Sequence, residues 1–287
     1  MIVKEYKNAD TFLEAYETFL LEREAVSQLL LYSAYQNRYN AAEDKGMFGA
    51  VLMEELPVLL FCNFMPFDLV VYVAREEEVS HAAEELAGYI CQNHIVINGI
   101  VARNDVCQSF IDQFKKLVSC NFSDGTGMDI MELRQIRDVK PVEGSQRLAL
   151  PEEAKLLADW MIDFQIEALM NDLDYEAALN KIKNLIVGQN VYLYENEEGQ
   201  AVTMAATVRK LPHGMAIAYV FTPEEFRGKG YAAANMYYLS KRLLEEGYEF
   251  CTLLVDKNNP LSNRAYEKVG YEILEDSYTY KLIPYEA

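Results

Sequence analysis

Apolar residues in the first half of the chain recur first at helical spacing and then in strand-like runs. Residues 10–38 carry apolar side chains three or four positions apart, as at Phe12, Ala15 and Phe19, which is typical of an amphipathic helix. Runs rich in β-branched and aromatic residues predict strands at 47–54, 56–63 and 67–74. After them we predict a helix at 77–92, a strand at 94–101, a helix at 105–117 and a strand at 127–137.

The second half of the chain repeats much of this order. We predict a short strand at 146–149, helices at 152–169 and 175–186, and strands at 191–195, 201–209 and 215–221. A helix at 228–245, a strand at 249–255, a helix at 261–268 and a strand at 271–283 follow. Strands that first form a meander and are later joined by helices indicate an α/β fold with a mixed sheet (α+β). The halves show no close sequence repeat, so a duplication would be old or only architectural.

One segment interrupts both patterns near the middle of the chain. Residues 138–145 read Asp-Val-Lys-Pro-Val-Glu-Gly-Ser, with a proline and a glycine close together. The chain has 287 residues, enough for two domains of about 150 residues each. Apolar residues make up 51% of it, which excludes global disorder. The sequence therefore predicts two domains, residues 1–140 and residues 145–287.

The charge balance excludes several classes of partner. With 26 Lys and Arg against 45 Asp and Glu, the formal net charge is −19, which repels phosphate backbones and anionic lipid headgroups. The longest apolar stretch, residues 51–73, is broken by charged residues and prolines, and the first residues lack an apolar core of signal-peptide length. We expect a cytoplasmic protein that binds neither nucleic acid nor membrane, and the oligomeric state stays open.

Cysteine and histidine are too scattered to suggest a metal centre. The cysteines are odd in number and never paired as C-x-x-C, which is typical of reduced, buried thiols. The three histidines are far apart in the sequence, so neither a histidine metal site nor a Ser/His triad is indicated. We therefore expect no metal.

A first candidate site lies at residues 219–231, Tyr-Val-Phe-Thr-Pro-Glu-Glu-Phe-Arg-Gly-Lys-Gly-Tyr. The pattern predicts a strand, a turn and a helix that opens with Gly228 and Gly230. Glycines there let backbone N–H groups approach a ligand, and the helix start adds a partial positive charge, so a diphosphate fits. Arg227 and Lys229 add cations. A tight strand-to-helix turn without a ligand would have the same pattern.

A second segment, residues 256–271, directly follows a β-rich run. It reads Asp-Lys-Asn-Asn-Pro-Leu-Ser-Asn-Arg-Ala-Tyr-Glu-Lys-Val-Gly-Tyr. Pro260 and Ser262 stand where a helix would begin, and Gly270 stands where it would end. Asn263 and Tyr266 are three positions apart and so share a helix face.

Together the two segments resemble the GCN5-related N-acetyltransferase (GNAT) family, and the element order of residues 145–287 is similar to its fold. Residues 225–230 are similar to the family's R/Q-x-x-G-x-G/A pyrophosphate loop, and residues 259–271 to its N-x-x-S-x-x-x-Y-x-x-x-G-Y/F element. The sequence departs from the first motif at Glu225, where the family has Arg or Gln. Because backbone amides make most of the phosphate contacts, this change weakens the motif without removing the binding mode. The resemblance covers about half of the chain.

The resemblance implies acetyl-CoA as co-substrate and assigns roles to particular residues. The main chain of residues 219–221, in the strand predicted at 215–221, would pair with the pantetheine amides, and the amides that follow would hold the diphosphate. Asn263 would bond the pantetheine or phosphate portion, and Tyr266 would lie beside the sulfur as the catalytic residue. The cofactor-binding residues implied are Tyr219, Val220, Phe221, Arg227, Gly228, Lys229, Gly230, Tyr231, Ala232, Asn259, Ser262 and Asn263.

The chemistry needs few side chains. A neutral amine attacks the thioester carbonyl in a ternary complex, and an amide of Val220 or Phe221 can polarise that carbonyl. Tyr266, with a reference pKa of about 10, can protonate the departing thiolate, or it is a packed aromatic that closes a helix. Cys251, in the preceding β-rich run, could be imagined as an acyl-carrying nucleophile, but a buried strand cysteine is usually inert.

The general base is left open by the sequence. Family members often place a carboxylate on the strand at 215–221, which has none here. Glu224 and Glu225 follow that strand. Either could be the base, or both are solvated charges of the loop. Asp163 and Glu167, four positions apart, could line an amine pocket or form the wet face of their helix. A chain of water molecules could equally remove the proton.

The first half resembles the second in element order only. Where a phosphate loop would follow its third strand, residues 75–80 read Arg-Glu-Glu-Glu-Val-Ser, without a glycine and with carboxylates that repel a diphosphate. We interpret residues 1–140 as a degenerate GNAT-like domain in a tandem arrangement; the alternative is an unrelated α/β accessory domain.

Three functions follow from these observations. The first is an acyl-CoA-dependent N-acyltransferase, using acetyl-CoA and acting on a small-molecule or peptide amine that the sequence does not specify. The second, suggested by Glu225 and the missing strand carboxylate, is a non-catalytic CoA-binding or sensing protein. The third is an interaction protein without a cofactor, for which both motifs would be coincidence.

Overall fold

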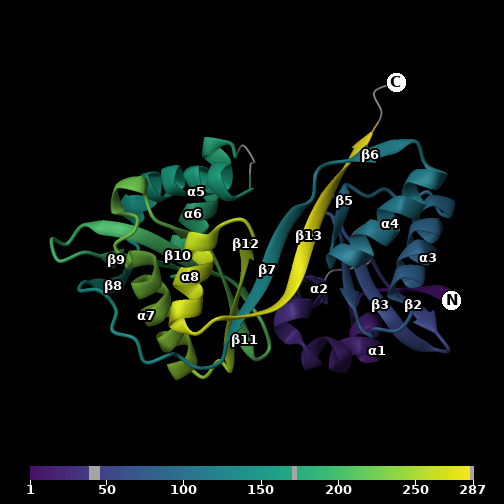
Figure 1. The fold of residues 1–287 in the computed structure, drawn as a ribbon, viewed down its shortest axis with the longest axis horizontal. Coiled ribbons are helices and arrows are strands. Elements are labelled where there is room, and N and C mark those ends of the chain that lie inside the picture. Colours follow the sequence, from purple (N-terminus) through teal and green to yellow (C-terminus); the bar gives the residue numbers. More distant parts are fainter. Residues whose placement is uncertain (39–45, 170–172, 285–287) are drawn as a thin grey trace. The chain divides into compact units, whose positions relative to one another are not determined.

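The computed structural model describes residues 1–38, 46–169 and 173–284, and it divides the chain into two compact units. Unit 1 consists of Met1–Asp129 and Glu275–Ala287, and unit 2 of Ile130–Leu274. The chain passes from unit 1 to unit 2 within strand β7 (Thr126–Leu133) and returns within strand β13 (Glu272–Pro284) (Figure 1). Each unit is described by itself below.

Unit 1 is a mixed sheet with helices on both faces. Its strands lie in the order β1-β2-β3-β4-β5-β13, with β6 also paired to β13. All these neighbours are antiparallel except β4 and β5, which are parallel. The elements are β1 (Ile2–Tyr6), α1 (Ala9–Glu22), α2 (Glu24–Gln36), β2 (Met47–Met53), β3 (Leu56–Asn63), β4 (Leu69–Val73), α3 (Val79–Gln92), β5 (Gly99–Ala102), α4 (Asn104–Leu117) and β6 (Cys120–Phe122).

Alternation along the strands of unit 1 produces two cores. In β3, Leu59 and Phe61 pack in the core formed with α3 and α4, whereas Leu60 and Cys62 pack in the core formed with α1 and α2. Successive side chains of a strand point to opposite faces, so a strand with apolar residues at every position must be covered on both sides.

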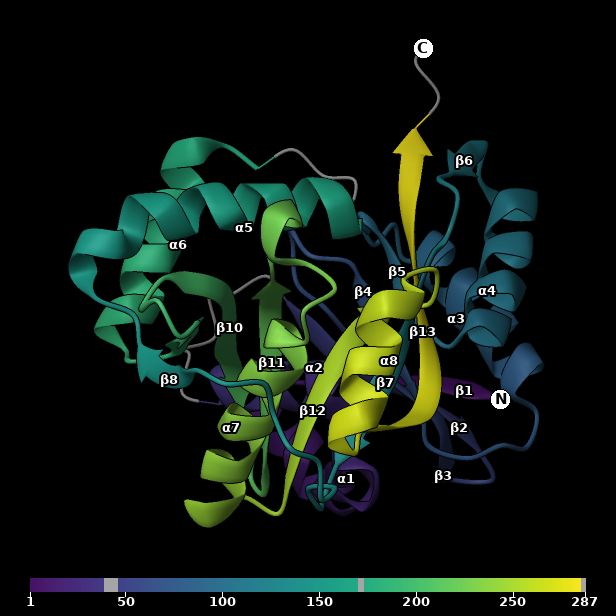
Figure 2. The same ribbon diagram turned by 60° about the vertical axis from the view of Figure 1, so that its left-hand side comes forward.

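Unit 2 has the same kind of layered arrangement. Its strands lie in the order β7-β12-β11-β10-β9-β8, with β11 and β12 parallel. Helices α7 and α8 cover one face of this sheet and α5 and α6 the other (Figure 2). In β10, Ala205 packs in the core with α7 and α8, whereas Met204 and Ala206 pack in the core with α5 and α6. The elements are β8 (Ser145–Leu148), η1 (Pro151–Glu153), α5 (Ala154–Leu169), α6 (Tyr175–Val187), β9 (Val191–Glu195), β10 (Ala201–Lys210), β11 (Gly214–Phe221), η2 (Glu224–Phe226), α7 (Tyr231–Glu245), β12 (Phe250–Asp256) and α8 (Pro260–Val269).

This mixed α/β architecture confirms the predicted fold class. Both units run strand, two helices, three strands, helix, strand, helix. The next strand along the chain does not join the sheet of its own series. Strand β7, which follows the series of unit 1, lies beside β12 in unit 2, and β13, which follows the series of unit 2, lies beside β5 in unit 1. Tyr278 of β13, for example, pairs with Ala102 of β5. The division of the structure therefore differs from the predicted one, since residues 275–287 belong to unit 1 and residues 130–144 to unit 2.

Three local features of unit 1 refine or correct the predictions. The helical spacing at 10–38 is confirmed, and the region forms two helices that meet at Arg23. The strand predicted at 94–101 covers only Gly99–Ala102, because His94 has a left-handed backbone (φ 54°) after α3 and the N–H of Ile95 donates to the carbonyl of Ile90. Strand β1, which is short and pairs with β2, was not predicted.

Candidate functional site

Strands β11 and β12 pair over only part of their length. Their parallel register joins Gly214–Ala216 to Phe250–Thr252, and the described residues that follow in either strand continue no such pairing. Further along β11, the register with β10 shifts between the Ala206–Ala218 and Met204–Phe221 pairs, and Tyr219 has a left-handed backbone (φ 54°). This bulge turns the end of β11 and leaves its main chain open on the β12 side.

The side chains at the bulge lie among aromatic residues of unit 2. The Tyr219 ring lies 5.7 Å, centroid to centroid, from Phe164 of α5, and Phe221 lies 6.3 Å from Trp160. The ammonium of Lys181 in α6 lies 4.8 Å from the centroid of the Tyr219 ring. Helices α5 and α6 therefore wall one side of the strand end with aromatic surface.

The loop from β11 to α7 presents a run of backbone donors. Gly228 and Gly230 have left-handed backbones (φ 76° and 86°), which explains why glycine is needed at both. Gly230 is the N-cap of α7 and has no capping side chain. In the described part of the chain no acceptor is present for the N–H groups of residues 228–233, and the first N–H to bond is that of Ala234, to the Gly230 carbonyl. Unsatisfied donors at a helix start form an anion site.

The two cations of this loop are already in contact with other groups. Arg227 donates from Nε to the Thr222 carbonyl (2.8 Å) and from Nη2 to both carboxylate oxygens of Glu167 (2.9 and 2.7 Å). Lys229 donates from Nζ to the Glu225 carbonyl (3.2 Å). The structure thus brings together Arg227 and Glu167, which the sequence had placed in two different parts of the site.

The second motif forms helix α8 as predicted. Asn259 caps its start, since the Asn259 side chain accepts from the N–H of Ser262 (3.1 Å), and Pro260 occupies the first turn. Both Asn259 and Ser262 therefore have a structural role at the helix start. The Asn263 Oδ1 atom is buried and has no hydrogen-bond partner among the residues that the structure describes, so a donor from a ligand would satisfy it.

Tyr266 is nearly buried beside Tyr271, with 6% of its surface exposed and 6.0 Å between ring centroids. Burial raises the pKa of Tyr266 above its ordinary value, so the phenol is protonated at neutral pH. The Tyr266 hydroxyl makes no hydrogen bond to any residue that the structure describes. The hydroxyl is therefore protonated and can donate a hydrogen bond to a ligand.

The remaining candidates for a general base or a nucleophile lack the surroundings that such a role needs. Glu224 and Glu225 are exposed in η2, and Asp163 is exposed on α5 without an ion pair to a described residue. Cys251 is fully buried, and burial raises the pKa of its thiol to about 12, which disfavours a nucleophilic thiolate. The identity of the base thus stays open.

Two threonines hold the end of β11 in place, and no sequence motif indicated them. Thr203 in β10 donates to the Phe221 carbonyl (2.7 Å), and Thr222 donates to the Thr203 hydroxyl (2.9 Å). Because 18 or more positions separate each pair, no local pattern could reveal this contact. It holds the main chain where β11 turns into the glycine loop.

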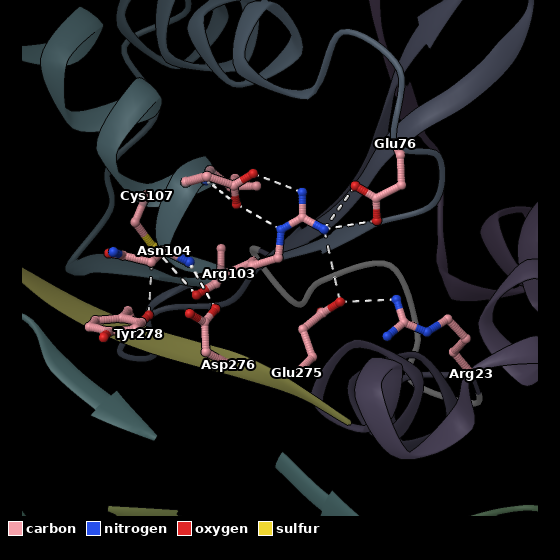
Figure 3. A network of polar contacts seen from close by, with 11 residues as sticks. Arg23, Glu76, Arg103, Asn104, Cys107, Glu275, Asp276 and Tyr278 are labelled. Atoms are coloured by element: carbon pink, nitrogen blue, oxygen red, sulfur yellow. Dashed lines mark hydrogen bonds and ion pairs between the residues drawn. The ribbon is translucent and has the colours of Figure 1, made fainter. Parts of the chain in front are cut away.

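An ion-pair network lies at the β4–α3 loop of unit 1, which corresponds in element order to the β11–α7 loop of unit 2 (Figure 3). Arg103, directly before α4, contacts Glu76 in the β4–α3 loop (2.8 Å) and Asp105 (2.7 Å). Glu275 lies 3.9 Å from Arg103 and 2.9 Å from Arg23. The pKa of Glu275 is nevertheless raised, mainly because the carboxyl group is buried. Carboxylates and arginines here satisfy one another.

The described residues contain neither a candidate metal centre nor a candidate membrane-spanning helix. No group of three or more His, Cys, Asp or Glu side chains there could hold a metal ion. None of the helices described is both long and apolar enough to cross a bilayer.

Comparisons with known proteins agree with these observations. The model of the Acetyltransferase (GNAT) family matches residues 155–271, so the GNAT domain predicted from the two motifs is confirmed there. No curated protein matches the sequence significantly.

Solved structures resemble the whole chain. They include a GNAT-family acetyltransferase from Colwellia psychrerythraea (12% identity, 99% of this chain and 100% of that one, TM-score 0.53) and a Drosophila protein (13%, 99% and 99%, 0.63). A GCN5-related N-acetyltransferase from Sphaerobacter thermophilus is similar over 100% of this chain and 96% of its own (14%, 0.59). At such identities the likeness shows a shared fold.

Proposed function

We propose that this chain, whose residues 155–271 form a domain of the GNAT acetyltransferase family, is an acyl-CoA-dependent N-acyltransferase. It would transfer an acyl group, acetyl in the first instance, to a primary amine by direct attack in a ternary complex. The amine would belong to a small molecule or a peptide.

The observation that carries this proposal is the run of unsatisfied backbone donors at residues 228–233. Two left-handed glycines and an uncapped helix start offer these N–H groups in a chain whose net charge is −19. An anion would satisfy them, and the CoA diphosphate is such an anion, whereas the β4–α3 loop of unit 1 carries three glutamates that would repel it. The amides of Gly228, Lys229, Gly230, Tyr231 and Ala232 would hold it, whereas the N–H of Arg227 already donates to the Glu224 carbonyl (3.1 Å).

Two further features fit the rest of acyl-CoA. The open side of β11 at Tyr219, Val220 and Phe221 offers main-chain groups to the pantetheine amides. The orphaned Oδ1 of Asn263 offers an acceptor to a pantetheine N–H or hydroxyl. Asn259 and Ser262 would act indirectly, since their bond to each other fixes the start of α8.

The residues of this chain would then act on the thioester. The amine nitrogen attacks the carbonyl carbon, and the N–H of Val220 or Phe221 stabilises the developing oxyanion. The carbon–sulfur bond breaks, and Tyr266 gives its proton to the thiolate. The proton lost by the amine goes to water or to a carboxylate beside the bound amine.

Unit 1 would take no direct part in this chemistry. Its β4–α3 loop carries Glu76, Glu77 and Glu78 instead of glycines, and Glu76 is paired with Arg103. We therefore regard unit 1 as a degenerate GNAT-like unit that binds no CoA.

Incubation with acetyl-CoA and a broad panel of amines, in which the release of free thiol is measured, tests the proposal. We expect thermal stabilisation by CoA and amine-dependent thiol release. Stabilisation without turnover on any amine would indicate a CoA-binding or sensing protein instead. Absence of any stabilisation by CoA would contradict both functions.

A further inference from the structure

Arg227 and Glu167 form a bidentate ion pair at the edge of the diphosphate loop. The two Nη2 contacts measure 2.9 and 2.7 Å, and the side chains are 38% and 50% exposed. Nε of Arg227 bonds the Thr222 carbonyl, and its guanidinium lies 5.6 Å from the centroid of the Phe221 ring. The guanidinium is thus held on the α5 side of the loop.

The residue that follows Arg227 begins the run of unsatisfied donors. A diphosphate held by the amides of residues 228–233 would carry more negative charge than a carboxylate, and phosphate oxygens accept from a guanidinium as readily as carboxylate oxygens do. An ion pair as exposed as Arg227–Glu167 adds little to stability, so it is easily exchanged.

We propose that Arg227 exchanges partners when the cofactor binds. Glu167 holds the guanidinium while the diphosphate is absent and yields it to the diphosphate on binding. Glu167 therefore competes with the cofactor for Arg227, and its role is not to stabilise the loop in its binding conformation. This inference rests on the proposed function of the same loop.

The two roles of Glu167 predict opposite effects on cofactor affinity. If Glu167 competes, Glu167→Gln should tighten CoA binding about two- to fivefold, which corresponds to the worth of an exposed ion pair. If Glu167 instead stabilises the loop in its binding conformation, the same variant should weaken CoA binding. Asp163→Asn is the matched control, because it removes the same charge one turn away on the same helix face and breaks no described ion pair.

Isothermal titration calorimetry with CoA, on variants whose circular dichroism and melting temperature match the wild type, measures this difference. We expect tighter binding for Glu167→Gln, little change for Asp163→Asn, and no effect of Glu167→Gln when Arg227→Ala is already present. Binding of pantetheine, which lacks the diphosphate, should not respond to Glu167→Gln.

Unchanged or weaker CoA binding by Glu167→Gln would overturn the exchange, as would an equal gain in Asp163→Asn. Either result would leave the proposed function intact, since the wild type would still bind CoA. A wild-type protein that binds no CoA would instead overturn the proposed function and this inference with it.

Discussion

Gly228→Ala is the most informative single change in the diphosphate loop. Gly228 has φ of 76°, and a Cβ placed on it would meet no other atom within 4 Å. The substitution therefore costs only the left-handed backbone of an L-residue, about 1–2 kcal/mol. Because the loop is exposed, it can relieve this strain by leaving the left-handed region, which turns its N–H groups away from the anion.

The chain offers a close control for this change. Gly199, in the turn between β9 and β10, also has φ of 76° and also has no atom within 4 Å of a built Cβ. Gly199→Ala imposes the same backbone strain away from the loop. Its melting temperature should fall by about 2–4 °C for each kcal/mol lost, while its affinity for CoA should not change.

Titration calorimetry with CoA compares the two variants. A strain of about 1–2 kcal/mol that must be restored on binding corresponds to an affinity about five- to thirtyfold weaker for Gly228→Ala. Equal CoA affinities of Gly228→Ala, Gly199→Ala and the wild type would refute the role of the loop amides.

Three further predictions concern other residues. Tyr266→Phe should lower kcat about 100-fold or more with little change in the KM for acyl-CoA; unchanged turnover at every pH would remove Tyr266 as the acid. Asn263→Ala should weaken CoA binding measurably without lowering the melting temperature of the free protein, because Oδ1 has no partner to lose; a large loss of stability would contradict this. Arg147 holds the pKa of Glu153 below its usual range through two 2.8 Å bonds. That pair therefore adds stability above the unfolded pKa of Glu and loses it as pH falls through the lower folded pKa. Urea unfolding of Glu153→Gln should show a loss of about 1 kcal/mol at neutral pH that shrinks in acid; a constant loss would argue against the ion pair.

The local features of the site could be predicted from the sequence because they depend on neighbouring residues. The glycines at 228 and 230 are needed where the backbone is left-handed, and Asn259 with Pro260 begins α8. Each feature is fixed within one turn of chain, so spacing alone revealed it. The order of helices and strands followed from the apolar pattern for the same reason.

Contacts between distant segments could not be predicted. Alternation identified residues 271–283 as a strand, but a strand pattern does not specify which sheet it joins, so the pairing of Tyr278 with Ala102 was missed. Arg227 and Glu167 are 60 positions apart, and each is an ordinary exposed charge in its own segment. The partner of a surface charge depends on how the elements pack, which the local sequence does not encode.

Transfer of isotope-labelled acetyl from acetyl-CoA to an amine tests the central proposal most directly. Mass spectrometry of the amine, the protein and the released thiol follows every product of one turnover. We expect the label as an amide on the amine, one free thiol for each labelled amide, and unlabelled protein. Label on the protein as a covalent intermediate, or thiol release with the label in free acetate, would contradict direct transfer to an amine.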